Sequence, residues 1–151
     1  MEERSQELLL NHELLDGQHA KIFRLVDALA LAFDSPRGGI EPAAAALADA
    51  LVTHLATEER LMDDTLYPER ARHRSAHELF MADFLQLREM LRDEGPTAAA
   101  REWVTRRIPE WLRFHISVND FPLGVYLGRR AAQGVPAPQR DGGRRPSSPR
   151  A

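Results

Sequence analysis

The chain has 151 residues, of which 43% are hydrophobic, and a formal net charge of -3, which suits one globular domain with a sizeable core. It contains no cysteine, so disulfides, cysteine-ligated zinc and iron–sulfur clusters are all excluded. The acidic balance offers no basic face for nucleic acid, no apolar run approaches the roughly 20 residues of a membrane span, and no signal peptide is visible. We therefore expect a cytoplasmic protein with no nucleic-acid or membrane partner.

The first part of the chain is predicted to be a leader followed by a long helix. Residues 1–15 form the leader, whose leucines 8, 9 and 10 are apolar enough to pack against the body. Asp16 is predicted to cap the helix over residues 17–33, in which apolar residues recur at three- and four-residue steps. His12 is assigned a surface or packing role, and the Pro- and Gly-rich residues 34–39 are predicted to be a loop.

Three further helices are predicted from apolar spacing and from their start and stop signals. The second starts at Glu41-Pro42 and ends before Pro68, and the third runs over residues 69–92. The fourth starts near Thr97 and should be bent or split by Pro109, with a short final turn or helix near residues 125–127.

The helices together predict an all-α fold, an up-down-up-down four-helix bundle over residues 16–130. Residues 131–151 change to Pro, Gly, Ser and Arg with few apolar side chains, which predicts a disordered tail.

Five of the six histidines fall on the inward faces of these helices or at their margins, accompanied by two carboxylates. The pairs His54/Glu58 and His73/His77 are each four residues apart, so each pair lies on one helical face, one turn apart. Burying such groups without compensation is costly, and a metal ion removes that cost. The complete candidate set is His19, His54, Glu58, His73, His77, His115 and Asp120.

Seven ligands exceed the need of one small metal ion and suit two ions that share carboxylates. Imidazoles with carboxylates favour iron over zinc, manganese or cobalt, and the absence of thiolates disfavours copper(I). Two tyrosines, Tyr67 and Tyr126, are assigned structural roles, and Glu59 is expected to point away from the site into solvent.

The spacing of His115 and Asp120 tests this interpretation. Five residues leave two side chains of an ideal helix roughly 140° apart, so an undistorted helix cannot aim both at one site. Pro122 should supply the distortion by loosening or ending the helix across residues 118–122, and Phe121 should be steered away from the α conformation. The irregular backbone would then fall where Asp120 must turn inward.

The pattern resembles the hemerythrins, and within them the bacterial hemerythrin-like proteins, over roughly residues 8–128. The matching segments are Leu14-Leu15-Asp16-Gly17-Gln18-His19, His54-x-x-x-Glu58, Tyr67-Pro68, His73-x-x-x-His77 and His115-Ile116-x-x-x-Asp120. The resemblance implies a non-heme di-iron centre with an oxo or hydroxo bridge that binds dioxygen reversibly, for carriage, storage or sensing, rather than an enzyme.

Carried over by position, the resemblance assigns a role to each candidate. His73, His77 and His115 would hold one iron, His19 and His54 the other, which keeps an open position, and Glu58 and Asp120 would bridge the two irons. Apolar side chains would line the dioxygen pocket, namely Ile22, Trp111, Leu112 and Ile116. A di-iron redox enzyme or sensor acting on nitric oxide or peroxide is the alternative, and a monomer, or at most a weak homo-oligomer, is expected.

Overall fold

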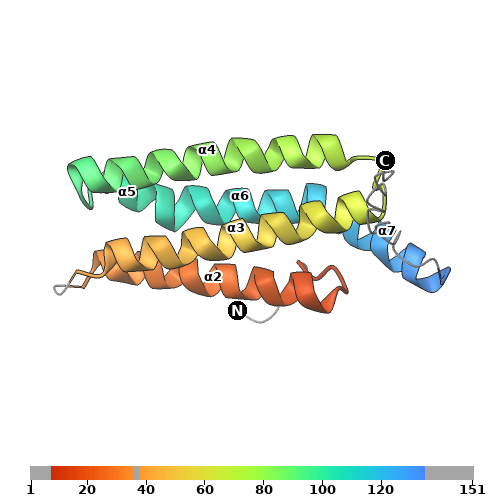
Figure 1. Ribbon diagram of the computed structural model, residues 1–151. Helices are drawn as coiled ribbons and strands as arrows, with labels where there is room; N and C mark the ends of the chain where they lie inside the picture. Colours follow the sequence, from red (N-terminus) through yellow and green to blue (C-terminus); the bar gives the residue numbers. More distant parts are fainter. Residues whose placement is uncertain (1–7, 36–37, 135–151) are drawn as a thin grey trace, which may run out of the picture.

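Four antiparallel helical rods form the computed structural model, which describes residues 8–35 and 38–134 (Figure 1). The first three rods are α2 (Glu13–Phe33), α3 (Ile40–Asp64) and α4 (Arg70–Glu94). The fourth consists of α5 (Ala98–Glu102), η1 (Trp103–Arg107), α6 (Ile108–His115), η2 (Ile116–Asp120) and α7 (Phe121–Ala132). No strand occurs in the described ranges, so the predicted all-α four-helix bundle is confirmed. The predicted tail lies outside these ranges from residue 135 onward, while residues 131 and 132 still belong to α7.

The first helix begins earlier than predicted, because His12 and not Asp16 is its N-cap. The His12 ring accepts a hydrogen bond from the backbone N–H of Leu15 through Nδ1, at 3.4 Å. Asp16 lies one turn inside α2, and its carboxylate accepts from the N–H groups of Leu10, at 2.8 Å, and His12, at 3.2 Å. Asp16 therefore fastens the leader to the helix, and the expectation that it caps the helix is wrong.

The other boundaries follow the predicted signals closely. α3 begins after Gly39, whose φ of 102° suits glycine, and α3 ends four residues before Pro68. Thr97 caps α5 by accepting from Ala100 N–H at 3.2 Å, in agreement with the predicted start of the fourth helix.

The fourth rod stays helical through both prolines, because each follows a π-helical turn. The N–H groups of Ile108 and Phe121 donate to carbonyls five residues back, in Trp103 and Ile116. The wider turn redirects the carbonyls that a proline ring would otherwise meet. Ile108 and Phe121 keep α-helical angles, so the expectation that Phe121 leaves the α conformation is wrong, and the last helix is longer than the short turn predicted.

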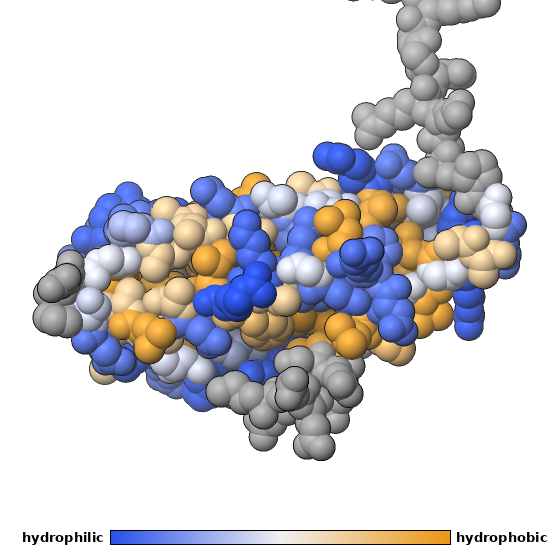
Figure 2. Space-filling model, turned by 90° about the horizontal axis from the view of Figure 1, so that it is seen from below, coloured by the Kyte–Doolittle hydropathy of each residue, from blue (hydrophilic) through white to orange (hydrophobic). Residues whose placement is uncertain are grey.

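Two apolar clusters fill the bundle, one on each side of a polar centre. The larger cluster packs α2, α3, α4 and the first part of the fourth rod around Leu29, Leu47 and Phe84. The smaller cluster joins the leader residue Leu10 to Met62 and to α7. No helix of the described residues is long and apolar enough to cross a membrane, and Figure 2 shows polar and apolar side chains interspersed on one face.

α7 turns away from the line of α6 at the end of the bundle (Figure 1). The leader crosses α7 at Gly124, where a Cβ atom would lie 3.0 Å from both the Cβ and the carbonyl oxygen of Leu10. Only a glycine permits this approach without a shift of the leader. The smaller core cluster therefore depends on a residue that has no side chain of its own.

Candidate metal centre

All seven predicted ligand residues lie in the interior and meet between the two apolar clusters. Glu58 and Asp120 are 0% exposed, and the five histidines are 2–6% exposed. α2 supplies one histidine, α3 one histidine and Glu58, α4 two histidines, and the fourth rod the remaining pair. Such burial of charged and titratable groups requires partners of opposite charge or a bound cation.

The π-helical turn η2 is what aims Asp120 inward. Within η2 the backbone bonds span five residues, so side chains five apart fall on one face instead of roughly 140° apart. Asp120 Oδ1 consequently lies 3.0 Å from His115 Nε2. The predicted distortion is present, but η2 covers Ile116–Asp120, two residues ahead of the predicted range 118–122, and it loosens the helix without ending it.

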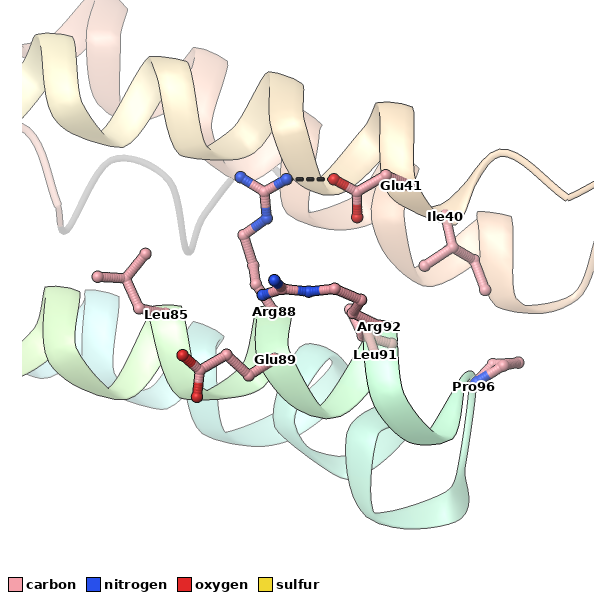
Figure 3. A pocket seen from close by; sticks show the side chains of 8 residues that line it. All are labelled: Ile40, Glu41, Leu85, Arg88, Glu89, Leu91, Arg92 and Pro96. Carbon is pink, nitrogen blue, oxygen red and sulfur yellow. Dashed lines mark hydrogen bonds and ion pairs between the residues drawn. The ribbon is translucent and has the colours of Figure 1, made fainter.

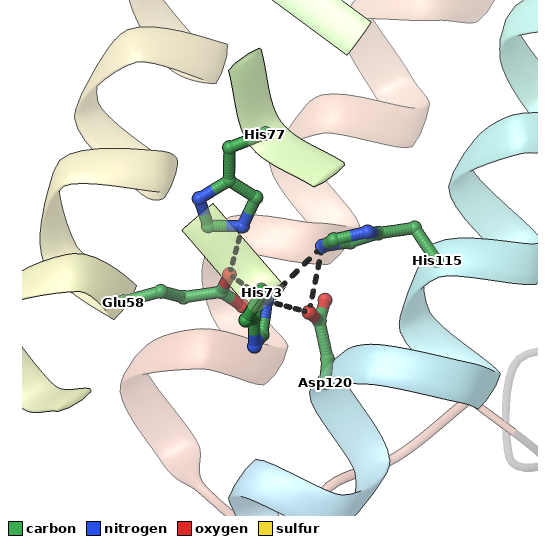
Figure 4. A group of neighbouring side chains, drawn as sticks. All are labelled: Glu58, His73, His77, His115 and Asp120. Carbon is green, nitrogen blue, oxygen red and sulfur yellow. Dashed lines mark hydrogen bonds and ion pairs between the residues drawn. The ribbon is translucent and has the colours of Figure 1, made fainter. Parts of the chain in front are cut away.

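Three histidines and two carboxylates form the first of two ligand groups (Figure 4). Glu58 Oε2 lies 3.2 Å from His73 Nε2 and 3.0 Å from His77 Nε2. Asp120 Oδ1 lies 3.0 Å from the Nε2 atoms of both His73 and His115. The three imidazoles thus present their Nε2 atoms to one point that both carboxylates also reach.

Two histidines and the same two carboxylates form the second group. The Nε2 atoms of His19 and His54 lie 3.0 Å apart. Glu58 Oε1 is 3.2 Å from His54 Nε2 and 3.8 Å from His19 Nε2, and Asp120 Oδ2 is 3.0 Å from His19 Nε2. Each carboxylate therefore directs one oxygen to each group, which is the arrangement of a bridging ligand.

Hydrogen bonds satisfy only some of the inward-facing ligand atoms, namely the Nε2 pairs His19–His54, at 3.0 Å, and His73–His115, at 3.2 Å. Both oxygens of Glu58, both oxygens of Asp120 and Nε2 of His77 are buried and have no hydrogen-bond partner. Atoms that converge on a common point, instead of on one another, are arranged to surround a cation. The donor set therefore fits two metal ions that share the carboxylates.

The carboxylates and His73 also perturb one another's protonation in the metal-free chain. Burial alone would raise the pKa of Glu58, but contact with the imidazoles of His54, His73 and His77 holds this pKa well below 4.5. The pKa of Asp120 is likewise lowered by His115, His19 and His73 against burial and the charge of Glu58. Burial lowers the pKa of His73, yet the two carboxylates outweigh it and raise that pKa to about 9. A proton on His73 thus supplies positive charge at the position offered to a metal.

Three outer contacts hold the imidazoles and were not foreseen as such from the sequence. His54 Nδ1 lies 2.8 Å from Gln18 Oε1, and His77 Nδ1 lies 3.2 Å from Glu59 Oε1. The Asn119 amide is 3.1 Å from His115 Nδ1, and its N and O atoms can exchange places to suit the ring. The expectation that Glu59 points away is wrong, because the start of α4 passes close enough for His77 to reach it.

The apolar residues predicted to line a dioxygen pocket belong to the two apolar clusters, Ile22, Trp111 and Leu112 to the larger and Ile116 to the smaller. Ile22, Leu112 and Ile116 are buried, and Trp111 is partly buried. The Trp111 ring stacks on the His115 ring, with centroids 4.5 Å apart. Trp111 therefore lies beside the three-histidine group, and the role of these four residues in binding dioxygen stays a prediction.

The tyrosines contact each other and the backbone, in agreement with structural roles. The rings of Tyr67 and Tyr126 lie 5.1 Å apart, and the Tyr126 hydroxyl donates to the carbonyl of Thr65 at 2.6 Å. Burial, followed by the charges of Glu69 and Asp120, raises the pKa of Tyr67. Tyr67 thus remains a neutral phenol within the smaller core cluster.

A groove of about 790 Å³ lies at another part of the bundle, between the start of α3 and the last turns of α4 (Figure 3). An ion pair between Arg88 and Glu41 crosses it. The lining contains no histidine and consists of Ile40, Glu41, Leu85, Arg88, Glu89, Leu91, Arg92 and Pro96. Its chemistry therefore does not compete with the buried centre for a transition metal.

Comparisons with known proteins agree with this geometry. Residues 10–124 match the family model described as the hemerythrin HHE cation binding domain. A protein named bacteriohemerythrin, from Stenotrophomonas maltophilia (strain R551-3), is 29% identical over 115 residues, which cover 76% of this chain and 73% of that protein. No solved structure matches the chain significantly. Residues 10–124, which match the family model, contain all seven candidate ligand residues.

Proposed function

This chain belongs to the hemerythrin family, and we propose that its buried centre holds two iron ions and binds dioxygen reversibly without turning it over. The observation that carries the proposal is the division of the site into a three-histidine and a two-histidine group joined by two shared carboxylates. An iron pair held in this way supplies the electrons that reversible binding of dioxygen requires.

The two groups differ in their number of histidines, and this difference suggests which metal position binds dioxygen. We assign one iron to His73, His77 and His115, and the other to His19 and His54, with the two carboxylates and a solvent-derived oxo or hydroxo group as bridges. With one protein ligand fewer, the two-histidine iron keeps an open coordination position for dioxygen.

The apolar side chains around the centre would then exclude water from it. We propose that Ile22, Leu112 and Ile116, all buried, together with Trp111, line the space that dioxygen occupies. A dry lining would retain the gas and oppose escape of reduced oxygen species, since a charged product gains little solvation there. The family match and the burial of these residues support this role.

The test is iron content combined with visible absorption of the protein, first reduced without air and then exposed to oxygen. We expect two irons per chain, a colourless reduced form, and an absorption band that appears in air and disappears under vacuum. Direct, irreversible oxidation in air would instead favour the enzyme or sensor acting on nitric oxide or peroxide, and absence of bound iron would refute the proposal. Cytoplasmic location and monomeric state stay predictions.

A further inference from the structure

The two proposed metal positions differ in the charge of the side chain that contacts Nδ1 of a histidine, on the side of the ring away from the centre. On the three-histidine side, His77 Nδ1 lies 3.2 Å from a carboxylate oxygen of Glu59. On the two-histidine side, His54 Nδ1 lies 2.8 Å from the amide oxygen of Gln18. Each ring turns its Nε2 toward the centre. With Nε2 bound to the proposed metal, Nδ1 carries the hydrogen and donates it to these oxygens.

The orientation of the Gln18 amide is fixed by a chain of hydrogen bonds. Gln18 Nε2 donates to the Thr57 hydroxyl at 3.1 Å, and that hydroxyl donates its only hydrogen to the carbonyl of Thr53 at 2.8 Å. A reversed amide would leave its oxygen facing a hydroxyl with no hydrogen to give. Gln18 therefore offers His54 a neutral oxygen, and nothing in this chain of bonds carries a charge.

Glu59 keeps its contact with His77 although a cation is near. Arg74 Nε is 3.7 Å from Glu59 Oε2, whereas the Arg74 guanidinium lies closer to Asp63, at 2.9 Å. Glu59 thus directs one oxygen to His77 and the other to Arg74. Its side chain is 32% exposed, so the carboxylate is shielded from water on the side of the ring.

We propose that Glu59 is a positioning residue that makes the two metal positions electronically unequal, by giving the three-histidine position a carboxylate–imidazole contact that the two-histidine position lacks. An imidazole that donates to a carboxylate is a stronger electron donor to its metal than one that donates to an amide. The three-histidine ion is accordingly held more tightly and gives up its electron at a lower potential. This inference rests on the proposed di-iron site.

The redox step involved is a one-electron oxidation of the iron beside His77. The electron passes to a soluble one-electron mediator, and the Nδ1 hydrogen stays between His77 and Glu59. No bond to a ligand needs to break, so a difference between variants reports the donor strength of the ring and not a rearrangement.

The test compares iron-loaded Glu59→Gln with Asp63→Asn and Gln18→Glu by mediated spectroelectrochemical titration and by iron release to a chelator. Glu59→Gln keeps the shape and the acceptor but removes the charge. At a fixed potential we expect it to shift the ferric-to-ferrous ratio of one iron about tenfold toward ferrous, or about 59 mV. We expect iron release to become about 10–100-fold faster.

The other two variants separate the contact from general charge effects. Asp63→Asn removes a neighbouring charge that contacts no ligand and leaves the Glu59 carboxylate beside His77. Arg74 then has Glu59 as its nearest remaining acidic partner among those described above, so we expect both readouts to change far less than in Glu59→Gln. Gln18→Glu places an anion on His54 and should shift the second iron toward ferric, and it keeps the test decisive if Glu59→Gln does not fold.

The outcomes distinguish this inference from the function on which it rests. Two bound irons with unchanged potentials in Glu59→Gln would overturn the role of Glu59 and leave the di-iron site intact. If that variant does not fold, unchanged potentials in Gln18→Glu would overturn the inference in the same way. Equal shifts in Asp63→Asn and Glu59→Gln would also overturn it, because the effect would then be that of any nearby charge. Failure of the parent protein to bind two irons would refute the proposed function itself.

Discussion

Removal of the proposed metal should destabilise the fold strongly, because several of the buried ligand atoms form no hydrogen bond within the protein. Five of them are buried without a hydrogen bond, namely both oxygens of Glu58, both oxygens of Asp120 and Nε2 of His77. Each unsatisfied buried polar atom costs about 1–3 kcal/mol, which gives about 5–15 kcal/mol for the set. Partial ion pairing with protonated imidazoles offsets part of this cost, so we expect the lower end, about 5 kcal/mol.

A loss of this size is comparable to the total stability of a small domain, about 5–15 kcal/mol. At about 2–8 °C per kcal/mol, the metal-free chain should melt at least about 10 °C below the iron-loaded chain. The assay is calorimetry or circular dichroism on the protein before and after anaerobic removal of iron with a chelator, with iron added back to one sample.

A double variant, Glu58→Leu with Asp120→Val, provides the matched control. It removes four of the five unpaired atoms and the shared ligands, so its melting temperature should be the same with and without iron. The reasoning would be refuted if the metal-free and iron-loaded parent proteins melted together, or if the chelator lowered the melting of the double variant equally.

Three further predictions concern the ligands, the leader and pH. His77→Ala should bring the iron content, measured by elemental analysis, below two per chain. His12→Ala should keep two irons and lose about 1 kcal/mol of stability, as expected for a lost helix cap. Loss of iron in His12→Ala would contradict the ligand assignment. Gly124→Ala should lower the free energy of unfolding, measured by chemical denaturation, by about 1–3 kcal/mol because its Cβ meets the leader. Gly128→Ala, with nothing within 4 Å of its Cβ, should be neutral or stabilising. Equal effects of the two variants would refute the close approach of the leader to Gly124. In the metal-free chain the folded pKa of His73, about 9, exceeds its ordinary 6.5, so its contribution to stability is complete below about pH 6.5 and lost as the pH rises through 9. The lowered pKa values of the two shared carboxylates act in the opposite sense, so their contribution to stability is lost as the pH falls below about 4. A metal-free chain that is more stable at pH 9 than at pH 6 would be inconsistent with the His73 contacts.

Much of the site could be predicted because local spacing already determines which side chains share a face. His54 and Glu58, like His73 and His77, are one turn apart in any α-helix, whatever the helix packs against. The apolar spacing around them predicted which face of each helix is buried. Proline and glycine marked the three connections between the helical rods. The number and types of ligands then predicted a shared two-metal centre before any distance was known.

The outer contacts of the ligands could not be predicted in the same way. Glu59 follows Glu58 directly and so starts on a different face of α3, from which only the packing of α4 brings His77 within reach. Gln18 precedes His19 on α2, yet it contacts His54 of a neighbouring helix. Contacts between helices depend on their separation and rotation, which no spacing within one helix contains.

The sequence by itself determined the four amphipathic helices, the buried face of each, and the seven candidate ligand residues, since these follow from periodicity and side-chain chemistry along a single helix. Only the tertiary structure decided how the helical turns adapt to them. The proline signals predicted that the helix loosens or ends across residues 118–122, whereas the rod continues and widens into a π-helical turn over Ile116–Asp120. Distances between helices likewise decide which group of histidines each carboxylate oxygen faces, and they bring the Glu59 carboxylate to His77 Nδ1. Local propensity cannot set these distances.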